Sequence, residues 1–428
     1  MPKTQAPLTR QHGKNAFLFV IVTVALDMMG FGLVVPVIPS LLKEVMDLEP
    51  EDAVAWGGAL TATYALMNFL ATPMLGNLSD RFGRRPVLLA SIGTLVIDFL
   101  VMGVANTFWV LLLGRALSGI SSSTFSTANA YIADVTTPED RGRAFGMIGA
   151  AFGVGFVVGP AMGAVFSTIS PRAPFFAAAG LAAINFLYGW FVLPESLAKE
   201  NRRSFEWKRA NPLGAFQHFR KLPKVVWFIL AAGIFGFAHA VYPATWNFHC
   251  KIRYGWEDWE IGLSLALVGV GAAVVQAGLV GVLVKRFGPF KTAWIGILIN
   301  AFALACFAFA EKAWMAYAII PISALGGIGG PAMNTIMSNL TPKNSQGELH
   351  GATASLGALA MVISPIVMTQ TLHNFSKADA EIHFPGAAFL LAALITLLAM
   401  LPFTVGLRAN GEQIKTPEVT PSAVPDAD

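Results

Sequence analysis

Three ionisable side chains of this 428-residue chain, Asp27, Asp98 and Arg115, lie inside long apolar stretches. A carboxyl group that is desolvated but close to a cation is balanced between its charged and neutral forms, so it can bind and release a proton. If these stretches cross a membrane, a central guanidinium costs at least roughly 2.5–3.5 kcal/mol to insert, so Arg115 should face a cavity or an acid. We expect these residues to carry out proton coupling. A purely structural contact between Asp98 and Arg115 is the alternative.

A second charged group lies in the loop Gly76-Asn77-Leu78-Ser79-Asp80-Arg81-Phe82-Gly83-Arg84-Arg85, between two apolar runs. Its glycines allow tight turns, and an ion pair in such a loop can bias an equilibrium between two conformations. We expect a conformational switch here, with plain surface charges at a helix end as the alternative. The residues concerned are Gly76, Asp80, Arg81, Gly83, Arg84 and Arg85. Asp134, near Arg141 and Arg143 at the end of another apolar run, is expected to join this network, with a cap at the C-terminus of its helix as the alternative.

The elements that must position these groups are long apolar helices. The chain is 55% hydrophobic and 13% charged, whereas soluble domains are roughly 25% charged. Runs of about 20 apolar residues can span a bilayer, and a helix pairs its backbone groups within one segment. The sequence predicts an all-α membrane protein with twelve transmembrane helices: Ala16–Leu42, Ala55–Gly76, Val87–Ala105, Phe108–Val135, Ala144–Phe166, Ala173–Leu193, Val225–Phe248, Ile261–Val284, Thr292–Ala310, Trp314–Leu340, Leu349–Leu372 and Phe384–Leu407.

Loop glycines recur at a fixed spacing in the second half of the chain. Gly281 and Gly288 follow Gly76 and Gly83 by 205 positions. Such an offset in a membrane chain indicates two copies of one helical bundle. The copies differ at the switch, because the position of the second copy that corresponds to Asp80 holds Lys285.

The span pattern also predicts the domain organisation. The expected units are a cytoplasmic N-terminus at 1–15, a six-helix bundle at 16–193, a cytoplasmic central loop at 194–224, a second six-helix bundle at 225–407 and a disordered cytoplasmic tail at 408–428. In the central loop, Leu213, Phe216 and Phe219 are spaced as on a short helix lying on a membrane surface. A flexible linker is the alternative.

Lys and Arg are distributed unevenly between the two sides of these spans. Of these residues, 22 lie on the side of both termini and 6 on the opposite side. Basic residues concentrate on the cytoplasmic side, so we expect a multi-pass plasma (inner) membrane protein with both termini cytoplasmic. This asymmetry accounts for the basic net charge without a nucleic-acid partner. The seven His and two Cys lack the spacing of a metal site, so no metal or other cofactor is expected.

Small residues are concentrated in the fifth predicted span, at Gly155, Gly159, Pro160 and Gly163. In lipid, helices approach one another closely at small residues, and neighbours can satisfy the carbonyl that a proline frees. We expect a hinge or gate at these positions, and helix packing alone is the alternative.

These motifs resemble the major facilitator superfamily, and within it the twelve-span drug/proton antiporters, especially the tetracycline-resistance exporter group. The loop from Gly76 to Arg85 fits the superfamily signature G-x-L-[S/A]-D-R-x-G-[R/K]-[R/K]. Gly155–Gly163 fits the antiporter motif G-x-x-x-G-P-x-x-G-G except at its last position, Ala164. Leu113-Gly114-Arg115 resembles the antiporters' membrane arginine motif, and Asp27-Met28-Met29-Gly30-Phe31-Gly32 resembles the first helix of tetracycline exporters. The resemblance implies two pseudo-symmetric six-helix bundles, alternating access, and an ion pair of Asp80 that locks the two bundles together when the outside gate is open.

The chain departs from tetracycline exporters at two positions of the expected cavity. Where those proteins have a His in the eighth span and an Asp in the ninth, this chain has Ala272 and Asn300. The difference puts transport of a metal-chelated tetracycline in doubt. The expected substrate-cavity residues are Asn68, Asn129, His239, Tyr242, Trp246, Gln276, Asn300 and Asn334, with Tyr64 and Phe237 as further aromatic surface. For each of them, packing between helices is the alternative.

The sequence therefore predicts a transporter and not an enzyme. The expected activity is proton-coupled antiport that exports small amphipathic or hydrophobic molecules, as in drug-resistance efflux. Expected partners are a small-molecule substrate, protons and membrane lipid, with no nucleic acid and with function as a monomer. Transport of a native metabolite or sugar stays open, as does a non-transporting membrane sensor on the same fold. A membrane enzyme would need clustered metal ligands or a nucleophile with its base, which the sequence does not offer.

Overall fold

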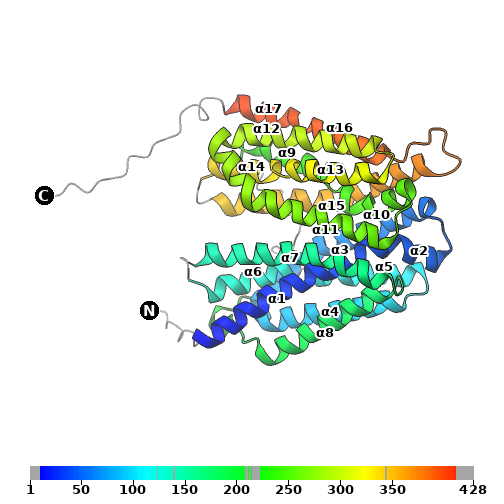
Figure 1. Cartoon of the computed structure of the whole chain (residues 1–428). Helices are drawn as coiled ribbons and strands as arrows, with labels where there is room; N and C mark the ends of the chain where they lie inside the picture. The colour runs from blue at the N-terminus through cyan, green and yellow to red at the C-terminus, as the bar shows by residue number, and fades with distance from the viewer. Residues whose placement is uncertain are drawn as a thin grey trace.

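The computed structural model describes residues 10–122, 124–137, 140–207, 211, 214, 222–342 and 345–410, and this part of the chain consists of helices and their connections. The helices run back and forth between two ends of the molecule (Figure 1). We call the end with the start of α1 and the end of α17 the terminal end, and the opposite one the distal end. The predicted tail beyond Asn410, residues 1–9, and Leu213, Phe216 and Phe219 of the central loop lie outside the described residues.

The first bundle holds six spans. They are α1 (Arg10–Val34) with η1 (Val35–Val37) and α2 (Ile38–Met46); α3 (Pro50–Phe82); α4 (Arg84–Val104); α5 (Phe108–Ser121) with α6 (Thr124–Val135); α7 (Arg141–Ser167); and α8 (Ala173–Val192). The short turn η2 (Lys199–Asn201) follows in the central loop.

The second bundle repeats the arrangement. Its elements are α9 (Val226–His239) and α10 (Val241–Tyr254); α11 (Asp258–Val274) with the π-helical η4 (Val275–Leu279); α12 (Val280–Phe309); α13 (Ala313–Gly326) and α14 (Gly329–Leu340); α15 (Gln346–Ser376); and α16 (Ala387–Leu398) with α17 (Met400–Ala409). The first, fourth, seventh and tenth spans are each divided between two helices, and so is the twelfth.

Nine helical runs of the described chain are long and apolar enough to cross a membrane. One of them, Asp258–Phe309, is 52 residues long and contains two spans, because Gly288 leaves the helical region (φ 78°, ψ 158°). The other two spans are α3 and the pair α5–α6. The helices therefore fit the twelve predicted spans. Gly83, at φ 107°, also has positive φ, so the repeated loop glycines share a conformation that other residues rarely adopt.

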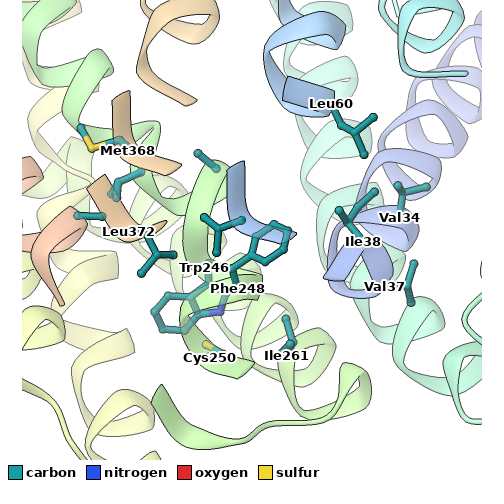
Figure 2. Close-up of a cluster of buried hydrophobic side chains, with 14 of the residues drawn as sticks. Val34, Val37, Ile38, Leu60, Trp246, Phe248, Cys250, Ile261, Met368 and Leu372 are labelled. Atoms are coloured by element: carbon teal, nitrogen blue, oxygen red, sulfur yellow. The ribbon is translucent and has the colours of Figure 1, made fainter. Parts of the chain in front are cut away.

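Among the residues that the structure describes, the hydrophobic core that joins the two bundles lies at the distal end. One cluster of buried side chains there contains residues of both bundles, including Val34 and Leu60 of the first and Phe248, Ile261 and Met368 of the second (Figure 2). At the terminal end the cores are separate. One surrounds Phe19, Leu88 and Tyr131 in the first bundle, and another surrounds Phe228, Met333 and Phe403 in the second. The conformation is therefore closed at the distal end and open at the terminal end.

Helix α7 lies between α1 and α11. Cβ atoms added at Gly155, Gly159 and Gly163 would meet the α1 backbone, and the Pro160 ring lies against Gly32 of the same helix. On the other side, a Cβ at Gly262 of α11 would meet the Pro160 carbonyl and Ala164. These glycines let three backbones approach closely, which is how helices associate in lipid.

We expect Gly159→Ala to lower the thermal unfolding temperature in detergent, because the added methyl would collide with the Met29 backbone. Overpacking of this kind typically costs about 1–3 kcal/mol. Gly149→Ala is the matched control, because nothing lies within 4 Å of a Cβ at that glycine of the same helix. Equal unfolding temperatures for the two variants would contradict the close α1–α7 contact.

Candidate functional site

Arg115 lies inside the first bundle on α5 and is 7% exposed. Its guanidinium stacks over the ring of Tyr64 on α3, with 5.5 Å from Cζ to the ring centroid. Asp98 of α4 is fully buried, attracts Arg115 electrostatically and accepts a hydrogen bond from the Ser118 hydroxyl. Asp98 Oδ1 and Arg115 Nε have no hydrogen-bond partner among the described residues. Both groups therefore keep capacity for a further partner.

Tyr64 connects the three predicted proton-coupling residues. Its side chain lies near Arg115, Asp27 and Asp98, which come from three different helices. Asp27 itself lies on α1 between Ala25 and Met29, where α1 contacts the glycines of α7. The structure thus gathers the intramembrane charges of the first bundle around one tyrosine. We call Asp27, Tyr64, Asp98 and Arg115 the central cluster.

A cavity between the bundles begins at this cluster. Its lining comes from both bundles: Phe31, Val34, Val35, Ile38, Leu60, Thr61, Tyr64, Arg115, Pro243, Asn247 and Phe248. Arg115 contributes the only charge among these residues. The distal core lies directly beyond, because Val34, Ile38, Leu60 and Phe248 belong to both. In this conformation the volume of the cavity, about 30 Å³, suits a water molecule, and the cavity lies at the junction between the shared core and the separated terminal halves.

Several predicted cavity residues make contacts inside their own bundle. The Asn68 amide donates a hydrogen bond to the Ser122 hydroxyl, and the Tyr242 and Ser323 hydroxyls hydrogen-bond at 2.8 Å. Trp246 Nε1 donates to Ser264 Oγ at 2.9 Å from within the distal core. His239 packs edge-on against Tyr242, with 5.1 Å between ring centroids. These contacts build an aromatic wall on α9 and α10.

The remaining predicted cavity residues are spread through the molecule. Asn129 lies on α6, Gln276 is exposed within η4, and Asn334 is exposed on α14. Asn300 on α12 is fully buried, and neither polar atom of its amide has a hydrogen-bond partner among the described residues. Burying an unpartnered polar atom costs roughly 1–3 kcal/mol. Among these residues, Asn300 is therefore the one whose amide would gain most from a hydrogen bond to a bound molecule.

Hydrogen bonds across the two bundles occur at the distal end. Asn247 Nδ2 donates to the Val35 carbonyl at 2.9 Å, and Ser40 Oγ donates to Asp258 Oδ1 at 2.8 Å. Lys251 Nζ pairs with the same carboxylate oxygen of Asp258 at 2.8 Å. Asn247 and Asp258 were not predicted as site residues from the sequence, because one lies within a predicted span and the other in a loop between spans. Their polar types within and beside an apolar run were the only available signal.

Arg84 organises the charged loop between α3 and α4. Its guanidinium contacts Asp80 at 2.6 Å and Asp134 at 3.2 Å, and it donates a hydrogen bond to Ser79 Oγ at 2.6 Å. Its backbone N–H donates to Glu195 Oε1 at 2.8 Å. Asp134 thus contacts this loop directly. Glu195 also contacts it and was not predicted from the sequence.

The loop residues make these contacts within one bundle. All partners of Asp80 and Arg84 that the described chain provides belong to the first bundle or to the adjoining central loop. Arg85 donates to the Trp190 carbonyl of α8 at 2.7 Å, and Arg81 lies over the Phe82 ring. The predicted lock between bundles is therefore not engaged in this conformation, which is open at the terminal end.

The sequence pattern of the Major Facilitator Superfamily matches residues 20–365. The chain belongs to this superfamily. Among the described residues, no group of three or more His, Cys, Asp or Glu side chains is placed to hold a metal ion.

Known proteins of the superfamily match along nearly the whole chain. The class C tetracycline resistance protein of Escherichia coli is 38% identical over 386 residues, covering 90% of this chain and 96% of that protein. The class B protein of Escherichia coli is 34% identical, with coverage of 92% and 98%. A solved bacterial homolog of the human lysosomal transporter Spinster superposes with a TM-score of 0.78 at 15% identity, covering 95% of this chain and 99% of that one.

These findings confirm the predicted fold class and the predicted family. The chain is an integral membrane transporter with the major facilitator fold, similar to the tetracycline exporters, and it is not an enzyme. The individual roles of the central cluster, the charged loop and the cavity residues stay predictions.

We expect Arg84→Lys to lower both the unfolding temperature and the transport rate. Lysine keeps the charge but cannot reach two carboxylates and a hydroxyl with one planar group, and each lost hydrogen bond to a charged group is worth about 1.5–3 kcal/mol. Arg286→Lys in the second repeat is the control, because Arg286 is exposed and stacks on the neighbouring Phe287. If both variants behave like the parent protein, Arg84 does not organise the loop.

Proposed function

We propose that this transporter exports a small amphipathic or hydrophobic molecule in exchange for protons, by alternating access to one cavity between its bundles. The observation that carries the proposal is the position of the central cluster. It lies beside the cavity, where the shared distal core ends and the separate terminal cores begin. The relatives of this chain include several tetracycline resistance proteins, which supports export of a drug-like molecule.

Alternating access follows from how the bundles are joined. The conformation is held by apolar packing and by hydrogen bonds at the distal end. Exchanging this packing for contacts at the terminal end would expose the same cavity to the other side. Transporters of this construction move largely by rocking one bundle against the other.

Proton coupling is assigned to Asp27, Asp98 and Arg115. Asp98 attracts Arg115, so a proton on Asp98 would change how strongly Arg115 is held. The affinity for a substrate bound beside Arg115 in the cavity would then change. The same charges can therefore respond to protons and to substrate.

The orientation proposed for this function places both termini in the cytoplasm of a plasma (inner) membrane. The support is the excess of Lys and Arg on the side of the termini, 22 against 6. The terminal end would then be the cytoplasmic opening. The units proposed are the bundles 16–193 and 225–407, joined by the loop 194–224, in a transporter that functions as a monomer.

The proposed substrate is a neutral or weakly cationic lipophilic compound. Ala272 and Asn300 occupy the positions where the resemblance to tetracycline exporters would place an imidazole and a carboxylate. A divalent metal complex gains from nearby oxygen acids, whereas the second bundle has a buried amide at Asn300 and aromatic rings around Tyr242. Stacking and a few hydrogen bonds suit an apolar ligand.

We expect Asp27→Asn to insert and fold normally but to lose proton-driven accumulation of substrate, because the amide cannot bind a transported proton. The measurement is uptake of a lipophilic substrate into inverted membrane vesicles with an imposed proton gradient. Asp52→Asn is the matched control, since Asp52 is an exposed acid at the start of α3. Full accumulation by Asp27→Asn would exclude Asp27 from coupling.

Expression in a pump-deficient bacterial host should raise tolerance to lipophilic compounds more than tolerance to tetracycline. Asn300→Asp should shift this preference towards tetracycline, because it adds a carboxylate at a buried position whose amide has no hydrogen-bond partner in the described part of the chain. The measurement is the minimum inhibitory concentration across a panel of compounds. Strong, selective tetracycline resistance from the parent chain would contradict the substrate proposal.

A further inference from the structure

The first part of the central loop is attached to the charged loop between α3 and α4. The Arg203 N–H donates to the Asp80 carbonyl at 3.0 Å, and the Asn77 amide donates to the Glu206 carbonyl at 2.7 Å. Ser196 Oγ donates to Asp134 Oδ2 at 3.2 Å. Backbone and side chains of residues 195–206 thus contact the predicted switch at several points.

Glu195 fixes the start of this segment. Its Oε1 accepts hydrogen bonds from the Arg84 N–H at 2.8 Å and the Leu197 N–H at 3.0 Å. A Cβ at Gly83 would collide with the Glu195 carboxylate, so this position requires glycine for space as well as for its positive φ. The carboxylate therefore caps the start of α4, where helix N–H groups lack partners within the helix.

The contact with Asp80 caps the neighbouring helix. Asp80 lies in the last turn of α3, where carbonyl groups have no intrahelical donor. Arg203 supplies that donor from the central loop. The segment then lines a polar hollow together with the switch: Asp80, Arg84, Asp134, Leu197, Glu200, Asn201, Arg202 and Arg203.

This attachment changes the connection between the bundles. Leu222 already belongs to the terminal core of the second bundle. The first bundle therefore holds the start of the connection between α8 and α9, and the second bundle holds its end. Release of residues 195–206 would detach the start of this connection and would uncover Asp80.

The charged end of α3 must move when the terminal end closes. α3 and α15 run in opposite directions and touch at their distal halves, where Gly58 packs against Thr369 and His373 hydrogen-bonds to the Glu51 carbonyl at 2.8 Å. Rocking about that contact would bring Asp80 towards the first turn of α15 at Gln346. A helix N-terminus attracts a carboxylate.

We propose that residues 195–206 form a latch that stabilises the terminal-open conformation by holding Asp80 and Arg84 within the first bundle. The latch has to release, at least at Asp80, before the terminal end closes. This role rests on the alternating access proposed above. It assigns to the central loop a part in the conformational cycle beyond joining the bundles.

Arg203→Pro tests the latch, with Arg203→Ala as its matched partner. Proline removes the N–H that Asp80 accepts, whereas alanine removes the side chain and keeps the N–H. Arg202 already has φ −69° and ψ 142°, which suits a residue that precedes proline. The difference between the variants therefore isolates one backbone hydrogen bond.

The readout is hydrogen–deuterium exchange of the purified full-length protein, which needs no transport assay. Relative to Arg203→Ala, Arg203→Pro should shift the equilibrium away from the terminal-open state by about fivefold or more. Exchange should then fall in the first turns of α7 and α15 and rise in α2 and the start of α11. Identical exchange in the two variants would overturn the latch.

A cross-link tests whether the latch must open. The double variant Asn77→Cys with Glu206→Cys, oxidised to a disulfide, should bind substrate from the terminal side but lose transport, and a reductant should restore it. The parent chain treated with the same oxidant controls for Cys250 and Cys306. Normal transport by the cross-linked protein would overturn the latch, whereas absence of transport from the parent chain would overturn the proposed function instead.

Discussion

The architecture depends on one apolar contact, the distal core that the two bundles share. Lipid offers no hydrophobic driving force between helices, so such a contact must rely on close fit and on polar pairs. The fit comes from glycines. Gly57 receives the Phe248 ring, Gly58 receives Thr369, and Gly262 lies on the Pro160 carbonyl. Asn247 and Ser40 add hydrogen bonds across the same boundary.

A contact confined to one end has a direct consequence for function. Each bundle keeps its own core at the terminal end, so it can rotate as a body without losing internal packing. The charged groups lie in the regions whose contacts would change in such a rotation. The central cluster is beside the cavity at the limit of the shared core, and the Arg84 network is at the free terminal end of α3.

The two bundles carry different kinds of functional side chain. Asp27, Asp98 and Arg115 all belong to the first bundle and converge on Tyr64. In the second bundle, within the described chain, aromatic rings gather around Tyr242 and the buried Asn300 amide has no hydrogen-bond partner. In our account the first bundle senses protons, and the second contributes much of the surface that selects the substrate.

Much of this could be predicted from the sequence, because the bilayer restricts a spanning segment to a helix of limited length. Gly83 and Gly288 marked the repeat, and the structure gives both a positive φ. The convergence of Asp27 and Asp98 on one tyrosine was less accessible, since it depends on the rotation of three helices. No pattern of residue types indicated that the central loop docks on the charged loop. This docking depends on backbone groups of Arg203 and Glu206, which leave no pattern in side-chain types.

The central claim is that one core at the distal end is exchanged for contacts at the terminal end. Pulsed electron spin resonance tests it most directly, with one pair of spin labels across the terminal ends of α3 and α15 and a second pair across α2 and the start of α11. When substrate and a proton gradient are supplied in reconstituted vesicles, the terminal distance should shorten while the distal distance lengthens. If both distances change in the same direction, or if neither changes, the two bundles do not exchange contacts in this way.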